Sequence, residues 1–391
     1  MKNIFKWPKE IYIFWLVEFV LGIELIGAVL LVFFKDWGGL SQTHTQMLQS
    51  WFTLWIFFLE IPTGVFGDIY GKKNSVILGI TLHIVGILVY TIMPNIWLFL
   101  LGEFIFALSV AFISGAKEAW IYDTAKRVKV EDRFREISVM GSNLHMAGMI
   151  VASLLYIPLS NIVSVQNLFR LGIVSSVVAL ILLWVFIKPT DGKNGLKPDY
   201  IGTIKKGVSI IKNSINLKRL ALLTSFLSTI SYFVIWLYQE VLRVLQTAQP
   251  EWGLYRTVLL VAQIVMIRVL GTYLKKSFNK GLVTLIILIF LGFMAVSILQ
   301  NSLGLIVLLI LSGGVGLQVN ALLSKEINEE ISSQQRATVL SFIGMIKRLM
   351  LTVFNPIIGY MVDMKGVYFA LMILGLLSLL GIFIKPKIKF K

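Results

Sequence analysis

Long apolar runs separated by short polar gaps make up most of the chain. A helix that crosses a bilayer needs about 20 mostly apolar residues, because the hydrocarbon core is about 30 Å thick. Twelve runs reach this length, at residues 11–34, 43–67, 75–93, 96–123, 137–160, 168–187, 219–246, 253–274, 281–299, 303–326, 338–361 and 366–384. The pattern predicts an all-α membrane protein with twelve transmembrane helices. No signal peptide precedes the first run, so we expect that run to be a span.

The composition indicates that lipid surrounds much of the protein. Charged residues make up only 14% of the 391 residues, whereas a soluble domain has about 25%. The absence of cysteine excludes disulfides, thiolate metal sites and cysteine nucleophiles. Because only three histidines remain, we expect no metal site and no cofactor.

The positions of the basic residues predict an orientation. The net charge is +16, which could indicate a nucleic-acid partner. However, alternate gaps and the two chain ends hold 27 Lys and Arg residues, and the opposite gaps hold only Lys35 and Lys365. Cytoplasmic segments of membrane proteins carry such an excess. We therefore expect both termini in the cytoplasm, and no nucleic acid as a partner.

The longest polar stretch separates six predicted helices from six. We expect an N-terminal bundle at 1–188, a cytoplasmic linker at 189–218 and a C-terminal bundle at 219–391. Apolar residues recur within the linker at steps of three and four, at Ile201, Ile204, Val208, Ile211 and Ile215. This spacing favours an amphipathic helix on the inner leaflet over a flexible linker.

A weak internal repeat supports the same division. Five residues of the first half have counterparts 203 positions later: Arg133, Ser138, Gly141, Asp123 and His145 correspond to Arg336, Ser341, Gly344, Glu326 and Arg348. Repeats of this kind place the substrate site between the two halves, near the bilayer midplane.

A glycine-rich polar segment, EIPTGVFGDIYGKKN, follows the second apolar run. It fits the pattern G-x-x-x-D-x-x-G-[RK]-[RK] with Gly64, Asp68, Gly71, Lys72 and Lys73. Its glycines permit a tight turn and a close approach of helices, and its lysines can pair with Asp123 at the inner end of another helix. The segment does not match a phosphate-binding loop, so we expect an ion gradient, and protons in particular, to drive the protein.

This segment resembles the cytoplasmic signature loop of the major facilitator superfamily, which lies after the second helix in that family. The resemblance implies the major facilitator fold and a secondary active transporter of a small molecule, not an enzyme. It implies a monomer in the plasma membrane of a prokaryote. It also implies a gate on the cytoplasmic side, made of Gly64, Asp68, Gly71, Lys72, Lys73, Asp123 and Glu60.

Acidic residues within the first predicted helix are the candidates for proton coupling. A charge near the centre of a spanning helix costs about 2.5 kcal/mol or more, so Glu24 requires either a function or a bonding partner on a neighbouring helix. Glu18 lies six residues earlier, which is about 120° around a continuous helix. We therefore expect that Glu18 and Glu24 do not both face one cavity.

Basic residues within the spans are candidate cavity groups. Lys347 and Arg348 lie near the middle of the eleventh run, and either hold a carboxylate such as Glu24 or bind an anionic substrate. His145 is a second candidate, or a histidine that bonds to a neighbour. We expect a structural salt bridge at the neighbours Lys117 and Glu118, and a pair of Glu240 and Arg243, which are three residues apart and can meet on one helix face.

Three functions are compatible with this pattern. The first is proton-coupled export of small amphipathic organic compounds, although the fifth predicted helix lacks the Gly-Pro motif common in drug antiporters of the family. The alternative is uptake or exchange of a small organic anion that Lys347 and Arg348 hold. A membrane-embedded transferase is remote, because the polar stretch 188–218 has no histidine and only Asp191 and Asp199.

Overall fold

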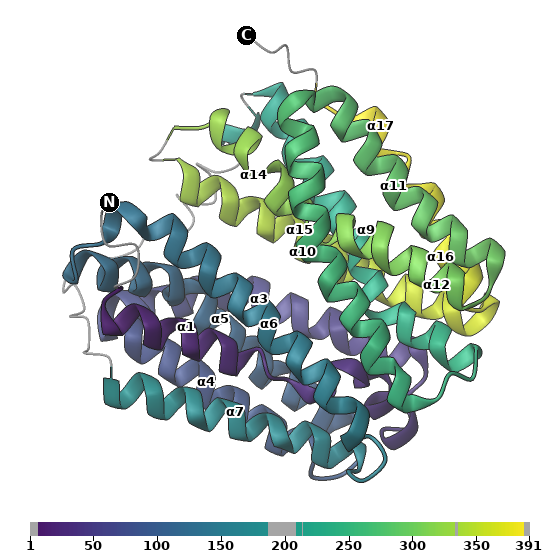
Figure 1. The fold of residues 1–391 in the computed structure, drawn as a ribbon, viewed down its shortest axis with the longest axis horizontal. Helices are drawn as coiled ribbons and strands as arrows, with labels where there is room; N and C mark the ends of the chain where they lie inside the picture. Colours follow the sequence, from purple (N-terminus) through teal and green to yellow (C-terminus); the bar gives the residue numbers. More distant parts are fainter. Residues whose placement is uncertain (1–6, 187–208, 213, 333–334, 387–391) are drawn as a thin grey trace. The chain divides into compact units, whose positions relative to one another are not determined.

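The computed structural model describes residues 7–186, 209–212, 214–332 and 335–386. Within these ranges all regular elements are helices and none is a strand (Figure 1). The elements before residue 187 are α1 (Lys9–Leu21), η1 (Leu25–Ala28), α2 (Leu30–Val32), η2 (Phe33–Trp37), α3 (Gln42–Tyr70), α4 (Lys72–Tyr90), α5 (Ile96–Arg127), η3 (Glu131–Arg133), α6 (Phe134–Leu159) and α7 (Val165–Phe186).

The elements after residue 214 have the same all-helical character. They are α9 (Ile215–Val244), η4 (Gln249–Glu251), α10 (Trp252–Lys276), α11 (Phe278–Leu299), α12 (Ser302–Leu308), η5 (Leu309–Gly313), α13 (Gly314–Gly316), α14 (Val319–Glu329), α15 (Arg336–Lys365), α16 (Val367–Ser378) and α17 (Gly381–Ile384). Most of the linker predicted at 189–218, and of its amphipathic helix, lies outside the described residues.

Each of the twelve predicted runs overlaps one or more of these helices, and the first, tenth and twelfth runs contain several. Ten helical stretches of the described residues are each long and apolar enough to cross a membrane. Helix α3 is the eleventh and bends by 47° between Glu60 and Pro62, because proline cannot donate the backbone hydrogen bond of a regular helix. The twelfth is the first run, which is interrupted. The prediction of an all-α membrane protein is therefore confirmed.

The interruption of the first run corrects the prediction of a continuous helix at 11–34. Helix α1 ends at Leu21, and the backbone at Glu24 is extended, with φ −112°. Gly22 packs on the backbone of α6, where a Cβ would overlap the carbonyl of His145 and crowd Gly148. A contact 120 residues away along the chain thus fixes the path of this segment.

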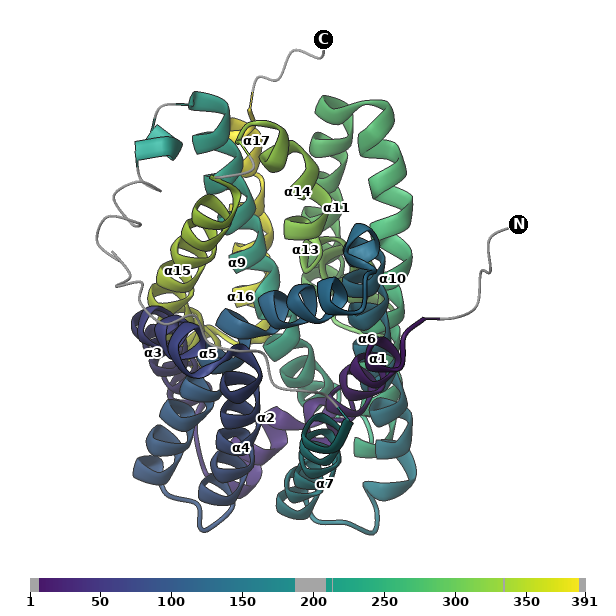
Figure 2. The same ribbon diagram turned by 90° about the vertical axis from the view of Figure 1, so that its left-hand side faces the viewer.

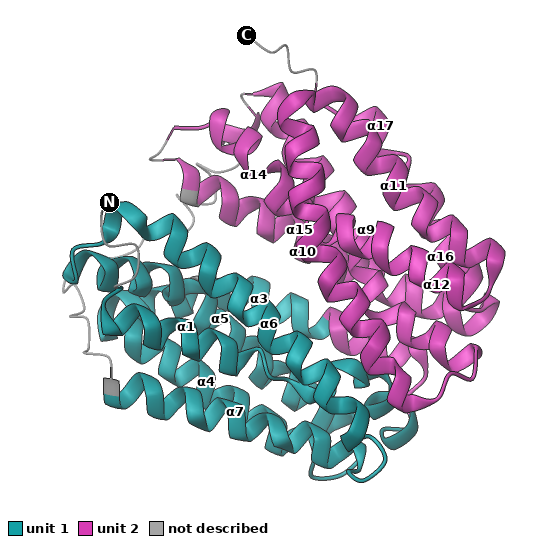
Figure 3. Ribbon diagram, viewed as in Figure 1, with its two compact units in different colours: residues 1–39, 51–198 teal, residues 40–50, 199–391 magenta. Residues whose placement is uncertain are grey.

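The chain divides into two units (Figure 3). Unit 1 contains residues 1–39 and 51–198, and unit 2 contains residues 40–50 and 199–391. In unit 1, α4 packs along α5, and α1 packs against α6 and α7 (Figure 2). In unit 2, α11 packs against α12 and α16, and α9 packs against α15.

Candidate functional site

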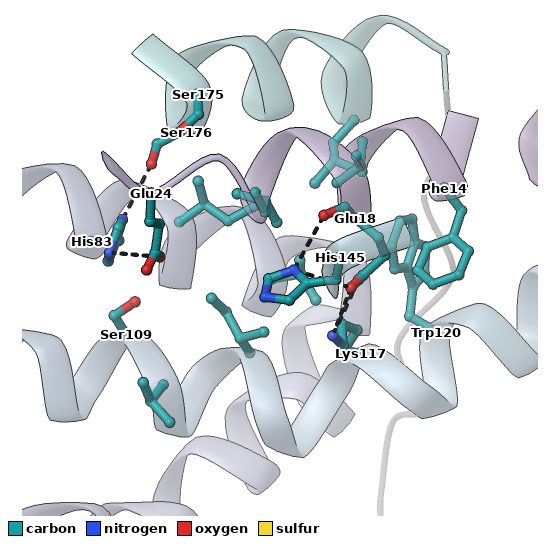
Figure 4. A pocket seen from close by; sticks show the side chains of 17 residues that line it. Phe14, Glu18, Glu24, His83, Ser109, Lys117, Trp120, His145, Ser175 and Ser176 are labelled. Atoms are coloured by element: carbon teal, nitrogen blue, oxygen red, sulfur yellow. Dashed lines mark hydrogen bonds and ion pairs between the residues drawn. The ribbon is translucent and has the colours of Figure 1, made fainter. Parts of the chain in front are cut away.

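A cavity of about 210 Å3 lies within unit 1, among α1, α4, α5, α6 and α7 (Figure 4). Apolar side chains such as Val17, Ile80 and Ile113 form most of its wall. Its polar and ionisable lining is Glu18, Glu24, His83, Ser109, Lys117, His145, Ser175 and Ser176. Within the described residues, no three His, Asp or Glu side chains converge as a metal ion would require.

At one end of the cavity, an ion pair joins α1 and α5. The Lys117 Nζ atom lies 3.1 Å and 3.2 Å from the two carboxylate oxygens of Glu18. The Glu18 side chain is only 5% exposed, so Lys117 neutralises a charge that would be costly to bury alone. The expected pair between Lys117 and Glu118 is therefore wrong, because Lys117 reaches across to α1 and Glu118 is exposed.

His145 of α6 completes this end of the cavity. Its Nδ1 atom lies 3.1 Å from the backbone carbonyl oxygen of Glu18 and 3.8 Å from a carboxylate oxygen of the same residue. The carbonyl of Glu18 can only accept, so Nδ1 carries a hydrogen and donates it. The structure places His145 both in the cavity and against a bonding partner.

The other end of the cavity is more open and holds a second carboxylate. Glu24 Oε1 lies 3.9 Å from His83 Nε2, and the Glu24 side chain is 43% exposed. His83 belongs to α4, and its Nδ1 atom lies 3.2 Å from the hydroxyl of Ser176 on α7. Glu24 therefore has one histidine as its partner and no lysine or arginine, among the described residues, within ion-pair distance.

Glu18 and Glu24 line the same cavity, so the expectation that they face apart is wrong. That expectation assumed a continuous helix, and the break after Leu21 changes the direction of Glu24. His83 was not among the predicted site residues. The sequence feature that could have identified His83 is its polar ring, which lies in the mostly apolar stretch ITLHIVG.

The predicted gate motif contains the turn that its glycines suggested. Gly71 separates α3 from α4 with φ 93°, a conformation that favours glycine. The Nζ atom of Lys72 lies 4.0 Å from Asp123 Oδ2, as the interpretation of the motif expects. Lys73 is buried and Asp68 is exposed.

Two other gate residues lie on α3. No described atom lies within 4 Å of where a Cβ on Gly64 would be, so close packing is not the reason for glycine there. Glu60 is half-buried and ends the first straight part of the helix.

The remaining candidates lie in unit 2. Lys347 and Arg348 are half-buried on α15. Their suggested role as the partners of Glu24 is not needed to explain that carboxylate, because His83 accompanies it. The predicted pair of Glu240 and Arg243 is confirmed, at 3.8 Å.

Comparison with known proteins identifies similar transporters. The sequence profile of the Major Facilitator Superfamily matches residues 15–354. The chain is 30% identical over 161 residues to the "Uncharacterized MFS-type transporter YxaM" of Bacillus subtilis (strain 168), and this match covers 39% of each protein. The matched stretch thus spans well under two thirds of the relative's own length.

Solved structures share the fold over nearly the whole chain. The nucleoside transporter NupG superposes with a TM-score of 0.79 at 13% identity, covering 96% of this chain and 98% of that chain. The E. coli fucose:proton symporter FucP superposes with a TM-score of 0.61 at 17% identity, covering 96% of this chain and 97% of that chain. At these identities the likeness shows the fold alone.

Proposed function

Since the chain belongs to the Major Facilitator Superfamily, and is thus a secondary transporter and not an enzyme, we propose that protons drive its transport. In this proposal the cavity of unit 1 is the proton-binding chamber, and Glu24 is the carboxylate that takes up and releases the proton. The observation that carries the proposal is the contrast between Glu24 and Glu18 in one cavity.

The two carboxylates differ in how easily each can accept a proton. Protonating Glu18 would break its ion pair with Lys117, which holds the Glu18 carboxylate in its charged form although this side chain is only 5% exposed. Among the described residues, Glu24 pairs with one histidine at 3.9 Å, and its side chain is 43% exposed. Glu24 therefore exchanges a proton at the lower cost, and the Glu18–Lys117 pair serves as a fixed wall of the chamber.

The size of the chamber indicates that protons and substrate bind at different sites. Pockets for drug-sized ligands measure about 300–1,000 Å3, whereas this cavity measures about 210 Å3. The chamber has room for water and a proton, and the amphipathic compounds of the leading hypothesis bind elsewhere.

We propose export of small amphipathic organic compounds as the physiological direction. The support is the acidic first segment and a chain in which 12% of residues are aromatic. The second candidate is uptake or exchange of a small organic anion, and it is supported by two adjacent basic residues, Lys347 and Arg348, inside the span Thr338–Lys365. We also infer that the protein acts as a monomer in the plasma membrane of a prokaryote, without nucleic acid.

The test of proton coupling compares two variants in reconstituted vesicles. The substrate comes from a growth or thermal-shift screen against dyes, antibiotics and small organic anions. Glu24→Gln is expected to abolish flux driven by a pH gradient while substrate binding is retained, because glutamine cannot exchange a proton. Glu18→Gln should instead lower the unfolding temperature, since it leaves Lys117 unpaired. Gradient-driven flux that is unchanged in Glu24→Gln would remove Glu24 from the mechanism.

The test of the substrate class replaces Lys347 and Arg348 of α15 one at a time. If the substrate is an organic anion, Lys347→Gln or Arg348→Gln should raise its KM at least 10-fold, because one charge-assisted hydrogen bond contributes about 1.5–3 kcal/mol. Anion flux that survives in both variants, while tolerance to dyes collapses, would leave export as the function.

A further inference from the structure

Three polar side chains from three segments are connected through the ring of His83 at the Glu24 end of the cavity (Figure 4). Glu24 follows α1, His83 belongs to α4 and Ser176 belongs to α7. The ring of His83 lies between the other two, with Nε2 toward the carboxylate at 3.9 Å and Nδ1 toward the hydroxyl at 3.2 Å. The inference from these contacts rests on the proposed proton coupling and names the residues that control proton binding.

When the Ser176 hydroxyl donates to the carbonyl of Gly172, it fixes which nitrogen of His83 carries the hydrogen. Ser176 Oγ donates to the carbonyl oxygen of Gly172 at 3.0 Å. A hydroxyl has one hydrogen to donate, so toward His83 the same oxygen can only accept. The Nδ1 atom of His83 is then the donor in that contact.

This tautomer has a consequence at Glu24. When Nδ1 carries the hydrogen of a neutral ring, Nε2 presents a lone pair. A lone pair and an ionised carboxylate repel each other, so the two groups bond only when a proton lies between them. We propose that Ser176, by fixing the tautomer of His83, makes the Glu24–His83 pair a store for one proton that is loaded and emptied in each transport cycle.

The proton balance of this store is simple. One proton arrives from water and forms an O–H bond on Glu24 or an N–H bond on His83 Nε2. The same bond breaks when the proton returns to water on the other side of the membrane. His83 and Glu24 share the proton, and Ser176 is a positioning residue.

The other ionisable groups of the cavity are already bonded to each other. The remaining titratable side chains in its lining are Glu18 on α1, Lys117 on α5 and His145 on α6. Helix α7 contributes no titratable side chain to the lining. Tyr90, Glu103 and Arg170 lie on the same helices outside the lining. Among the described residues, no ion pair joins Glu24 or His83 to any of these six.

The tautomer can be measured directly by 15N NMR of histidine-labelled protein. The chain has three histidines, so the spectrum is simple, and the His83→Gln variant assigns the signal. Above the pH at which the pair loses its proton, His83 should be the Nδ1–H tautomer in the natural chain and should lose this preference in Ser176→Ala. An Nε2–H tautomer in the natural chain, with Ser176 as its donor, would overturn the inference.

Ser175→Ala is the matched control for Ser176→Ala. The Ser175 hydroxyl lines the same cavity and donates to the same carbonyl of Gly172 at 2.9 Å, and no bond joins it to His83 among the described residues. Its removal should leave the tautomer of His83 unchanged. An equal effect of the two substitutions would mean that the carbonyl of Gly172, and not the hydroxyl of Ser176, acts on His83, and would overturn the inference.

A second experiment measures the protonation of Glu24 directly and needs no substrate. The infrared band of its carboxylic acid is identified as the band that Glu24→Gln removes, and the intensity of this band is measured against pH. In Ser176→Ala the freed ring can donate Nε2–H to ionised Glu24, so the midpoint should fall by about one pH unit or more. An unchanged midpoint would overturn the role of Ser176. Flux that is insensitive to Glu24→Gln would refute proton coupling through Glu24 and the use of this store in the transport cycle, whereas the role of Ser176 in setting the tautomer is judged by the two spectroscopic measurements.

Discussion

At the scale of single residues, Gly71 is a position where the backbone depends on the absence of a side chain. Its φ of 93° precedes Lys72, whose Nζ lies 4.0 Å from Asp123 Oδ2. Gly71→Ala is expected to cost about 1–3 kcal/mol of strain and to weaken this pair. The unfolding temperature in detergent and the initial rate of transport should both fall. Gly64→Ala is the control, since nothing lies within 4 Å of a Cβ there, and equal losses in both variants would contradict the argument.

At the scale of elements, the start of α3 and the end of α15 form a polar contact inside unit 2. The backbone N–H groups of Gln42 and Thr43 donate to the carboxylate of Asp363 at 3.1 Å and 2.8 Å. The side-chain amides of Gln42, Gln46 and Asn355 are fully buried, with no hydrogen-bond partner among the described residues. Gly359 packs closely on the start of α3, since a Cβ on it would lie 2.9 Å from the carbonyl oxygen of Gln42 and 3.0 Å from the Cβ of Gln46.

This contact predicts opposite effects of two substitutions on stability. Asn355→Leu should raise the free energy of unfolding by about 1 kcal/mol, because a buried amide without a partner is replaced by an apolar group of similar size. Asp363→Ala should lower it by about 0.5–2 kcal/mol, because two N–H groups of the first turn of α3 lose their acceptor. Thermal unfolding of the purified protein measures both. A loss of stability in Asn355→Leu would show that its amide is bonded.

The helices, and part of the candidate site, can be predicted from the sequence. Hydropathy identifies the twelve spans because a bilayer requires about 20 apolar residues from each one separately. The ionisable residues Glu18, Glu24 and His145 stand out for the same reason, since charge is rare in such runs. The break after Leu21 could not be predicted, because it depends on how Gly22 packs on α6. His83 and Ser176 could not be paired for a similar reason, as 93 residues separate them along the chain.

At the scale of the whole molecule, the distribution of basic residues decides which side of the membrane each loop faces. The chain has no cysteine, so a single introduced cysteine reports on one position without a background. Helix α11 offers a matched pair of sites, because Lys276 precedes it, Ser302 follows it and both are exposed. The helix ends around Lys276 also carry Lys275 on α10 and Lys280 on α11, whereas the helix ends around Ser302 carry no basic residue.

A membrane-impermeant maleimide should therefore label Ser302→Cys in intact cells and Lys276→Cys only after the membrane is permeabilised. One helix separates the two sites, so the result at one loop fixes the side of the other. Because the helices alternate in direction, the same result places both termini in the cytoplasm. Labelling of Lys276→Cys in intact cells would reverse the orientation of all twelve spans. It would also place the Lys72–Asp123 pair on the outer side, where a cytoplasmic gate could not form.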